Sequence, residues 1–334
     1  MILVTGGLGF IGSHVVLSLL AQGQAVVIVD NLANANLQCL ERLEFITGMY
    51  IPFVKIDIRN TPALNKVFEQ YSIDTVVHCA GFKSIEESNL KPLEYYNDNL
   101  SCIMSLLRAM QRTGVRNLVH LSSLMVYAQS SLELNEQTAF NYSYPNPYIK
   151  SQQMIEEIIK DTFKTDEEWK IAILRVSNVV GAFEHGVLGE FVAPLPKNVV
   201  PLALQVAAQQ RDLIEVQRNS ETADKTTERS FVHVLDVCEA IKSTILWLHE
   251  QGNVYQSFDI AGPVSSIQNL INLIEEVTAS QIHQIDAVYK LDELDQVAST
   301  SQKAFEVLKW KAQRSLKQMI EDEWRFYQNT LNNR

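Results

Sequence analysis

Short apolar runs alternate with segments of helical period over the first half of the chain. The apolar runs are rich in Val and Ile and lack the alternation of a half-exposed strand, which is typical of parallel strands covered by helices on both faces. This order predicts an α/β fold with a doubly wound parallel sheet. The expected strands are residues 2–5, 25–30, 53–56, 75–79, 118–122 and 171–176, and the expected helices are roughly residues 10–21, 62–71, 93–112 and 147–163.

The alternation of strands and helices then gives way to proline-containing loops and several helices. A polar stretch at residues 218–228 predicts a further loop. We therefore expect a first domain over residues 1–176 and a smaller C-terminal α/β lobe over residues 177–334. A further apolar run near the end of the segment 232–262 predicts a strand that returns to the sheet or its edge. That segment is thus expected to belong to the first domain.

The composition suits a chain with two packed lobes. Of its 334 residues, 46% are hydrophobic, which is enough for one large core and a smaller second one. The formal net charge is −11 and comes from a mixed distribution without long runs of one sign. Such a chain gains little from approaching a polyphosphate, so we expect no nucleic-acid partner.

The cysteines and the apolar stretches indicate a cytoplasmic protein. Cys39, Cys79, Cys102 and Cys238 are scattered, with no CxxC pair and no Cys/His cluster at metal-ligand spacing. We interpret them as reduced thiols and expect no metal site. No apolar stretch approaches the length that spans a membrane, and a strand-like run from residue 2 leaves no room for a signal segment.

Three glycines follow the first expected strand at the spacing GxxGxxG, directly before a helix. Gly6 would permit a tight turn, Gly9 would let backbone N–H groups approach a pyrophosphate, and Gly12 would let the helix pack closely on the strand. Glycines also end strands for purely structural reasons, but here strand, loop and helix come in the order of a Rossmann-type fold. The segment therefore predicts a dinucleotide site.

Acidic residues lie at the ends of the next two expected strands. Asp30 ends the second strand, where a carboxylate accepts hydrogen bonds from an adenosine ribose. Because a carboxylate repels a 2′-phosphate and no Arg follows closely, the site favours NAD over NADP; a helix-capping Asp is the alternative. Asp57 and Ile58 follow the third strand, where contact with the adenine and a role in a turn are both open.

Seven segments spread over the chain make the pattern more specific. They are TGGLGFIGSH from Thr5, the turn Asp30-Asn31-Leu32, DIRN at 57–60, HCAGFKS at 78–84, ESNLKPLEYY at 87–96, LSSLMVY at 121–127 and NPYIKS at 146–151. On these segments the chain resembles the UDP-glucose 4-epimerases of the extended short-chain dehydrogenase/reductase superfamily over nearly its whole length. The KPLEYY block and the His-x-Ala-Gly-x-Lys segment favour the epimerase branch.

The resemblance implies NAD as the cofactor and adds further contacts to it. A lysine near a pyrophosphate is physically sensible, although Lys83 reads as an ordinary surface lysine wherever no phosphate is present. The contacts implied beyond Gly6, Gly9, Gly12, Asp30, Asp57 and Ile58 are Phe10, Ile11, Asn31, Ala80, Gly81, Lys83 and Asn99.

The resemblance also implies the chemistry, which is epimerisation at C4 of a UDP-hexose. In the family a tyrosine removes the proton of the sugar 4-hydroxyl while C4 passes its hydride to NAD. The 4-keto sugar then turns over and takes the hydride back on its other face. Tyr148 matches that base, and Ser123 matches the hydroxyl that hydrogen-bonds the same oxygen. Ordinary packing is the alternative for a tyrosine just inside a helix.

One residue of the implied catalytic set is missing. The family motif Tyr-x-x-x-Lys places a lysine one helical turn after the tyrosine, where its ammonium lowers the tyrosine pKa and binds the nicotinamide ribose. Gln152 stands at that position, and Lys150 lies about 200° around the helix from Tyr148. Gln152 would still hydrogen-bond the ribose but adds no charge. We therefore expect turnover to be impaired or absent.

Candidate substrate contacts come from the same resemblance. Asn178 and Asn198 match asparagines that contact the nucleotide, and Arg229 matches an arginine that binds the diphosphate. Lys290 and Glu293 align loosely with an Arg and an Asp of the family. For each of these residues, the alternative to substrate binding is a structural role at the surface or in a helix cap.

The identity of the hexose is not fixed by these residues. Val297 stands where the family has an aromatic side chain, and a smaller residue there favours entry of an N-acetyl group. Residues 221–227 replace the glycine-rich loop that precedes Arg229 in the family. We therefore expect a UDP-sugar as the small-molecule partner, without choosing among hexoses.

The residues around Ser123 and Tyr148 also bear on three other functions. A nucleotide-sugar dehydratase needs an acidic pair after the strand-end hydroxyl residue, and a related decarboxylase needs an acid there too. Leu124 and Met125 follow Ser123 instead, which argues against both. A non-catalytic NAD- or nucleotide-sugar-binding homologue is favoured by Gln152 and opposed by the retained Tyr148 and Ser123.

The resemblance implies a homodimer. It would form through the apolar faces of the helices expected at residues 93–112 and 147–163. Those faces could equally be covered within one chain.

Overall fold

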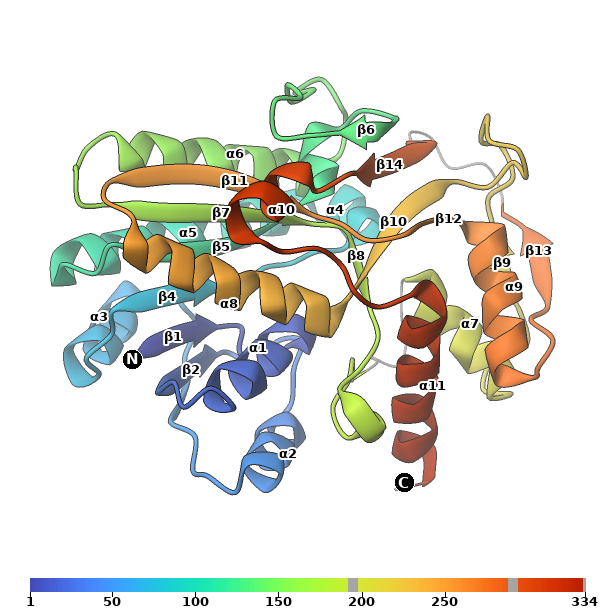
Figure 1. Ribbon diagram of the computed structural model, residues 1–334, viewed down its shortest axis with the longest axis horizontal. Coiled ribbons are helices and arrows are strands. Elements are labelled where there is room, and N and C mark those ends of the chain that lie inside the picture. Colours follow the sequence, from blue (N-terminus) through green and yellow to red (C-terminus); the bar gives the residue numbers. More distant parts are fainter. Residues whose placement is uncertain (192–197, 288–293, 333–334) are drawn as a thin grey trace.

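A seven-stranded parallel sheet forms the larger part of the molecule (Figure 1). The structure is a computed structural model that describes residues 1–191, 198–287 and 294–332. The strands lie in the order β11-β7-β5-β4-β1-β2-β3, and every neighbouring pair is parallel. The expected doubly wound sheet is therefore confirmed. Its strands are β1 Ile2–Thr5, β2 Val26–Asp30, β3 Phe53–Lys55, β4 Thr75–His78, β5 Asn117–Ser123, β7 Lys170–Val176 and β11 Val254–Ile260.

Helices cover both faces of this sheet, as its continuous apolar strands predict. Successive residues of a strand point to opposite faces, so Val4 and Val77 join one core cluster while Leu3 and Val76 join the other. The first face carries α1 Phe10–Leu20, α2 Leu37–Thr47, α8 Val234–Glu250 and α10 Gln302–Leu308. The second carries α3 Thr61–Gln70, α5 Pro92–Thr113 and α6 Pro147–Phe163.

Capping residues fix where these helices begin and end. Asn60 starts α3 by accepting a hydrogen bond from the Ala63 N–H at 3.2 Å. Asn146 starts α6 in the same way, accepting from the Ile149 N–H at 3.1 Å, and a proline occupies the first turn. α5 ends at Gly114, which has a φ of 77°. Glycine adopts this left-handed conformation at little energetic cost. The cap of α6 matters most, because Tyr148 lies immediately inside it.

A smaller α/β lobe lies beyond the carboxyl edge of the large sheet (Figure 1). Its main sheet has the order β12-β10-β14-β6, with β8 paired to β10, and β9 pairs with β13 separately. A third core cluster joins its helices to Phe231 of β10. Its elements are β6 Ser131–Leu134, β8 Asn178–Val180, α7 Val199–Ala207, β9 Ile214–Val216, β10 Glu228–His233, β12 Val264–Ser266, α9 Ile267–Thr278, β13 Gln284–Asp286, β14 Gln296–Ser299 and α11 Leu316–Asn332.

The chain passes between the two sheets more often than the sequence indicates. β11 returns to the edge of the large sheet beside β7, where a returning strand was expected. β6, from the first half of the chain, pairs with β14 of the smaller lobe, which was not expected. The helical elements not assigned from the sequence include α2, α4 Ile85–Leu90, the 3₁₀ helix η1 Leu124–Tyr127 and the short turn η2 Glu184–Gly186.

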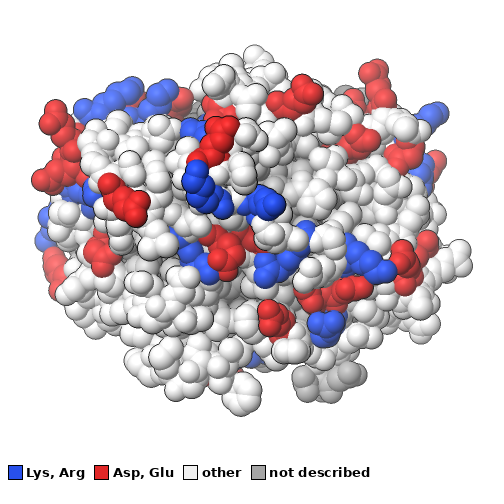
Figure 2. All heavy atoms as spheres, viewed as in Figure 1, with Lys and Arg blue, Asp and Glu red and all other residues white. Residues whose placement is uncertain are grey.

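The face drawn in Figure 2 carries acidic and basic side chains side by side, without a large area of one sign. This agrees with the mixed charge of the sequence. Within the described part of the chain, no helix is long and apolar enough to cross a membrane. Among the same residues, no group of His, Cys, Asp and Glu side chains could hold a metal ion.

Candidate active site

The glycine loop lies where the winding of the sheet reverses direction. β1 has β2 on one side and β4 on the other, so the connections that leave these strands diverge and open a crevice at the carboxyl edge. Gly6 has a φ of 66°, and a Cβ there would lie 2.8 Å from the Ala80 Cα. A Cβ on Gly12 would lie 2.1 Å from the Gly6 carbonyl oxygen. Both positions therefore require glycine.

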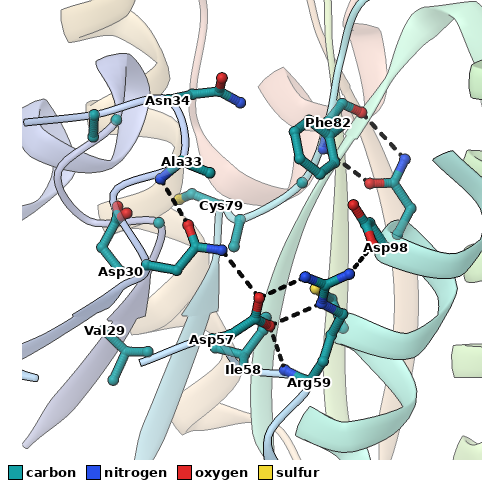
Figure 3. A pocket seen from close by; sticks show the side chains of 18 of the residues that line it. Val29, Asp30, Ala33, Asn34, Asp57, Ile58, Arg59, Cys79, Phe82 and Asp98 are labelled. Carbon is teal, nitrogen blue, oxygen red and sulfur yellow. Dashed lines mark hydrogen bonds and ion pairs between the residues drawn. The ribbon is translucent and has the colours of Figure 1, made fainter. Parts of the chain in front are cut away.

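An open cavity occupies this crevice (Figure 3). The empty space within it, including solvent at the mouth, is about 700 Å³. Gly9 is the N-cap of α1 and brings no capping side chain, so the first N–H groups of this helix remain available to an anion. The lining includes nine residues selected from the sequence, Gly6, Gly9, Asp30, Asn31, Asp57, Ile58, Ala80, Gly81 and Asn99.

Asp30 stabilises the glycine loop and the turn after β2 through backbone hydrogen bonds. Its Oδ2 accepts a hydrogen bond from the Leu8 N–H at 3.1 Å, and its Oδ1 accepts one from the Leu32 N–H at 2.8 Å. Burial raises the pKa of this carboxyl, and the backbone hydrogen bonds oppose that shift. Each oxygen keeps capacity for a further donor, such as a ribose hydroxyl.

A network of polar side chains closes the far wall of the cavity (Figure 3). Arg59 donates to both oxygens of Asp57, with Nε–Oδ1 and Nη2–Oδ2 distances of 2.9 and 2.6 Å, and its other nitrogen pairs with Asp98. Asn31 donates to Asp57 Oδ2 at 3.2 Å. Hydrogen bonding from Arg59 lowers the pKa of Asp57 to about 2. Asp57 therefore stays charged across the physiological range.

Asn99 connects this cavity to α6. Its Oδ1 accepts from the Phe82 N–H at 2.9 Å, and its Nδ2 donates to the Phe82 carbonyl at 3.2 Å, which holds the turn after Gly81. The same Nδ2 lies 3.1 Å from the Ser151 Oγ of α6. Because Ser151 is three residues after Tyr148, the cavity and the tyrosine belong to one connected site.

Five of the expected cofactor contacts do not line this cavity. Lys83 is one of them: its Nζ lies 3.2 Å from Glu190 Oε1 and 5.9 Å from the centre of the Phe10 ring. Its side chain is 60% exposed. An incoming phosphate would have to compete with Glu190 for this ammonium. The other four are Phe10, Ile11, Gly12 and Gln152.

Tyr148 and Ser123 come together at the carboxyl edge of β5. Ser123 ends this strand, and its Oγ accepts from the Met125 N–H at 3.2 Å. Tyr148 is 9% exposed. Burial raises the pKa of Tyr148, and a hydrogen bond with the Ser123 hydroxyl partly opposes the rise. The two side chains that the resemblance selected are therefore neighbours.

Gln152 lies one helical turn after Tyr148 and is 7% exposed. Its amide forms no hydrogen bond with another described residue. Lys150 is half-buried on a different side of α6, as the helical geometry predicts. No cation of the described chain acts on the Tyr148 pKa.

The expected substrate residues are spread over the smaller lobe, and the described ones do not line the cavity. Asn178 begins β8 and is exposed, as is Asn198 before α7. Arg229 of β10 is 8% exposed and donates to the Glu228 and Asp295 carbonyls at 3.0 and 3.2 Å. Val297 is its register partner on β14. Lys290 and Glu293 lie outside the described residues.

Several residues of the lining were not selected from the sequence. Arg59 lies in the DIRN segment, two residues after Asp57. An arginine this close in sequence to the aspartate predicts the contact between them. Asp98 comes from α5, and nothing local in the sequence places it beside Arg59. The unselected lining residues are Val29, Ala33, Asn34, Ala35, Ile56, Arg59, Cys79, Phe82, Asp98 and Cys102.

The model of the NAD dependent epimerase/dehydratase family matches residues 2–261 of the chain. The chain belongs to this family. As a family member it is 36% identical to the UDP-glucose 4-epimerase of Dictyostelium discoideum over 329 residues, which are 97% of this chain and 95% of that one. It is also 36% identical to the UDP-glucose 4-epimerase of Neisseria meningitidis serogroup C, over 99% of this chain and 98% of that one.

Solved structures agree with this family membership. The UDP-glucose 4-epimerase of Bifidobacterium longum, in complex with NAD+ and UDP, superposes with a TM-score of 0.95 at 31% identity. All of this chain and 99% of that one are covered. The enzyme from Stenotrophomonas maltophila, with bound NAD and formylated UDP-arabinopyranose, gives 0.94 at 32% identity and the same coverage. The resemblance to UDP-glucose 4-epimerases seen in the sequence is confirmed.

Proposed function

We propose that this protein is a NAD-dependent 4-epimerase of UDP-hexoses that works through a 4-keto sugar. The observation that carries the proposal is the hydrogen-bonded pair of Tyr148 and Ser123, joined through Asn99 to a cavity with a glycine cradle. Full-length relatives named UDP-glucose 4-epimerase support the same activity. This assignment would place the protein in galactose metabolism.

The cavity fits NAD. Gly6 and Gly12 leave no room for side chains where the backbone approaches, and α1 begins after Gly9 without a capping side chain, so its first N–H groups can meet a pyrophosphate. Asp30 and Asp57 would hold the adenosine half, because their carboxylates accept from ribose and adenine donors and disfavour a 2′-phosphate. Asn31, Ile58, Ala80, Gly81 and Asn99 would complete the walls, and Phe10, Ile11, Lys83 and Gln152 would reach the rest of the dinucleotide.

Two side chains, Tyr148 and Ser123, would handle the transfer of the 4-hydroxyl proton. Bound NAD would supply the acceptor and the donor of the hydride. Tyr148 Oη would remove the proton of the 4-hydroxyl as C4 is oxidised, and it would return that proton when the other face of the keto sugar is reduced. Ser123 Oγ would hold the same sugar oxygen. Gln152 would bind ribose without adding charge, so the reaction is expected to be slow at neutral pH.

The smaller lobe would bind the UDP moiety. Arg229 would neutralise the diphosphate through its guanidinium, and Asn178 and Asn198 would contact the nucleotide. Lys290 and Glu293 complete the set proposed from the family. We accordingly divide the chain into a NAD-binding domain, residues 1–176 with the returning segment near 232–262, and a UDP-sugar lobe, residues 177–334.

A non-catalytic homologue that keeps NAD or a nucleotide sugar is the second candidate. The neutral Gln152 and the absence of a described cation acting on Tyr148 favour it. A binding protein of this kind would keep the cavity but would not interconvert sugars.

Turnover decides between the two candidates. The purified protein would be incubated with UDP-galactose and, separately, with UDP-GalNAc, and the C4 epimers would be separated by chromatography. We expect slow formation of the epimer, lost in Tyr148→Phe and reduced by about 10- to 100-fold in Ser123→Ala. If NAD is bound but no epimer forms from either sugar, the binding-protein candidate is correct. The UDP-GalNAc arm also tests whether Val297 admits an N-acetyl group.

We also propose a homodimer in the cytoplasm. Leu93 and Met104 of α5 and Met154 of α6 are exposed large apolar side chains, although most of the apolar residues of these helices pack inside the chain. The four cysteines are unpaired thiols, which suits a reducing compartment. Light scattering at several concentrations tests the dimer, and a monomer throughout would remove it.

A further inference from the structure

A row of buried polar side chains crosses three strands just before the carboxyl edge of the sheet. Ser122 of β5 is in register with Arg175 of β7, and Arg175 is in register with Asp259 of β11. Their exposed fractions are 4%, 6% and 0%. Ser122 immediately precedes Ser123, so this row lies directly behind the proposed reacting pair.

Two further side chains join the row into one chain of hydrogen bonds. Glu156 of α6 accepts from Ser122 Oγ at 2.6 Å and from Arg175 Nη2 at 2.7 Å. Arg175 Nη1 donates to the Tyr127 hydroxyl at 2.9 Å, and that hydroxyl donates to Asp259 Oδ1 at 2.7 Å. We call Glu156, Arg175, Tyr127 and Asp259 the anchor chain.

The anchor chain ties together the two elements that carry the reacting hydroxyls. Glu156 is eight residues after Tyr148, about 12 Å along α6. Tyr127 ends η1, which begins directly after Ser123. A shift of α6 along β5 would break the Glu156 contacts to Ser122 and Arg175, so these contacts fix where the start of α6 stands relative to the end of β5.

The loop that leads into α6 is held by the same residues. The Phe140 ring and the Tyr127 ring lie 4.9 and 5.0 Å from the Arg175 guanidinium carbon. Asn141 donates its N–H to the Tyr127 carbonyl at 3.0 Å. Gln153 of α6 donates to the Val126 carbonyl at 2.6 Å. Contacts with η1 and Arg175 therefore hold both α6 and the loop that leads into it.

We propose that the anchor chain positions Tyr148 against Ser123, so that Glu156, Arg175 and Tyr127 are positioning residues for proton transfer. A buried ion pair is weak support for stability, because a well-packed apolar row in its place is often as stable. What an apolar row would not provide is directional contacts that fix the register of a helix on a strand. The inference rests on the proposed function insofar as it takes these two hydroxyls as the reacting pair.

Tyr127→Phe is the sharpest test, because it removes one hydroxyl and keeps the ring that stacks on Arg175. Glu156→Gln is the second variant, and it keeps the size of the side chain. Tyr327→Phe is the matched control: it also removes the hydroxyl of a buried tyrosine, which donates to Gln210 at 2.6 Å in the smaller lobe. All are compared as folded, NAD-loaded protein.

Two measurements are made on each variant. For Tyr127→Phe and Glu156→Gln we expect kcat for epimerisation to fall by about 10- to 100-fold with KM changed less than about threefold, because the hydroxyls are misplaced while binding is kept. We also expect the ring ¹³Cζ signal of Tyr148, assigned with Tyr148→Phe, to move as the Ser123 hydrogen bond loosens. Tyr327→Phe should change neither quantity.

The two readouts separate this inference from the proposed function. If wild type and Gln152→Lys both fail to form an epimer, the proposed activity fails, and the Tyr148 signal still reports on positioning. If Tyr127→Phe and Glu156→Gln leave that signal and any measurable kcat within twofold of wild type, the anchor chain is structural only and the inference is overturned.

Discussion

Tyr148 lies in an environment that keeps its hydroxyl protonated. Burial is the largest effect on its pKa and raises it, while the Ser123 hydrogen bond acts in the opposite direction. Gln152, one turn further along α6, contributes no charge. A base in this position would therefore be ionised in only a small fraction of molecules at neutral pH, and activity would rise toward alkaline pH.

Gln152→Lys should lower the pKa of Tyr148, because an ammonium one turn away favours the phenolate. We expect the rising limb of the kcat–pH profile to move to lower pH and kcat at pH 7 to increase by about tenfold or more. Gln152→Met, which is similar in size and uncharged, is the matched control and should leave the limb in place. An unchanged profile in Gln152→Lys would mean that this position does not govern the ionisation of Tyr148.

At the scale of single residues, the sequence identifies those whose role depends only on neighbouring positions in the chain. Gly6 and Gly12 could be selected because strand, loop and helix follow one another within a dozen residues. Asp30 could be selected because it ends the next strand. Asp98 could not, because its place beside Arg59 depends on how α5 packs against the end of β3. Arg229 was selected by resemblance, but its buried contacts with backbone carbonyls depend on the fold of the smaller lobe.

At the scale of elements, the end of α5 depends on one backbone conformation. Gly114 has a φ of 77°, and nothing lies within 4 Å of where its Cβ would be. Gly114→Ala should therefore destabilise the protein by about 1 kcal/mol through backbone strain alone. Gly252 is the matched control, because its Cβ would also meet nothing within 4 Å but its φ is not in the left-handed region.

Urea unfolding of the two alanine variants measures this difference. Gly252→Ala should be neutral or slightly more stable than wild type, since alanine restricts the unfolded chain. Equal free energies of unfolding for the two variants would contradict the assignment of a left-handed cap at Gly114.

The elements that the sequence predicted well are those with the strongest local pattern. α6 was expected at residues 147–163 and spans Pro147–Phe163, because Asn146 and Pro147 mark its start. β6 and β14 were not expected, and each has only four residues. They pair across more than 160 positions of sequence, Val297 with Ser131, and no pattern within either segment encodes that pairing.

At the scale of the whole molecule, α11 packs against the turn after β8, which lies more than 140 residues earlier in the sequence. Glu323 of α11 is 5% exposed, and its Oε2 accepts from the Gly181 N–H at 3.0 Å. Burial, and after it the charge of Glu190, raises the pKa of Glu323 to about 8, while the Gly181 hydrogen bond and Lys83 act against the rise. The contact between α11 and Gly181 is therefore made by a carboxyl that keeps its proton at neutral pH.

A raised carboxyl pKa makes the stability of the protein depend on pH. The unfolded chain releases this proton above about pH 4.5, whereas the folded chain holds it up to about pH 8. Between these values the folded state binds more protons, so this group lowers the free energy of unfolding as the pH rises. Glu323→Gln keeps an oxygen for the Gly181 N–H and never carries charge, so it lacks that dependence.

We expect Glu323→Gln to gain stability over wild type as the pH is raised from 5 to 8, by roughly 3 kcal/mol across that range. Urea unfolding of both proteins at several pH values measures the difference, in which the titrating groups that do not interact with Glu323 cancel. Glu321→Gln, on the same helix but partly exposed, controls for the replacement of a carboxyl by an amide on α11. A constant difference between Glu323→Gln and wild type would mean that Glu323 is ionised in the folded protein. In that case the Gly181 N–H would donate to a charged carboxylate rather than to a neutral carboxyl.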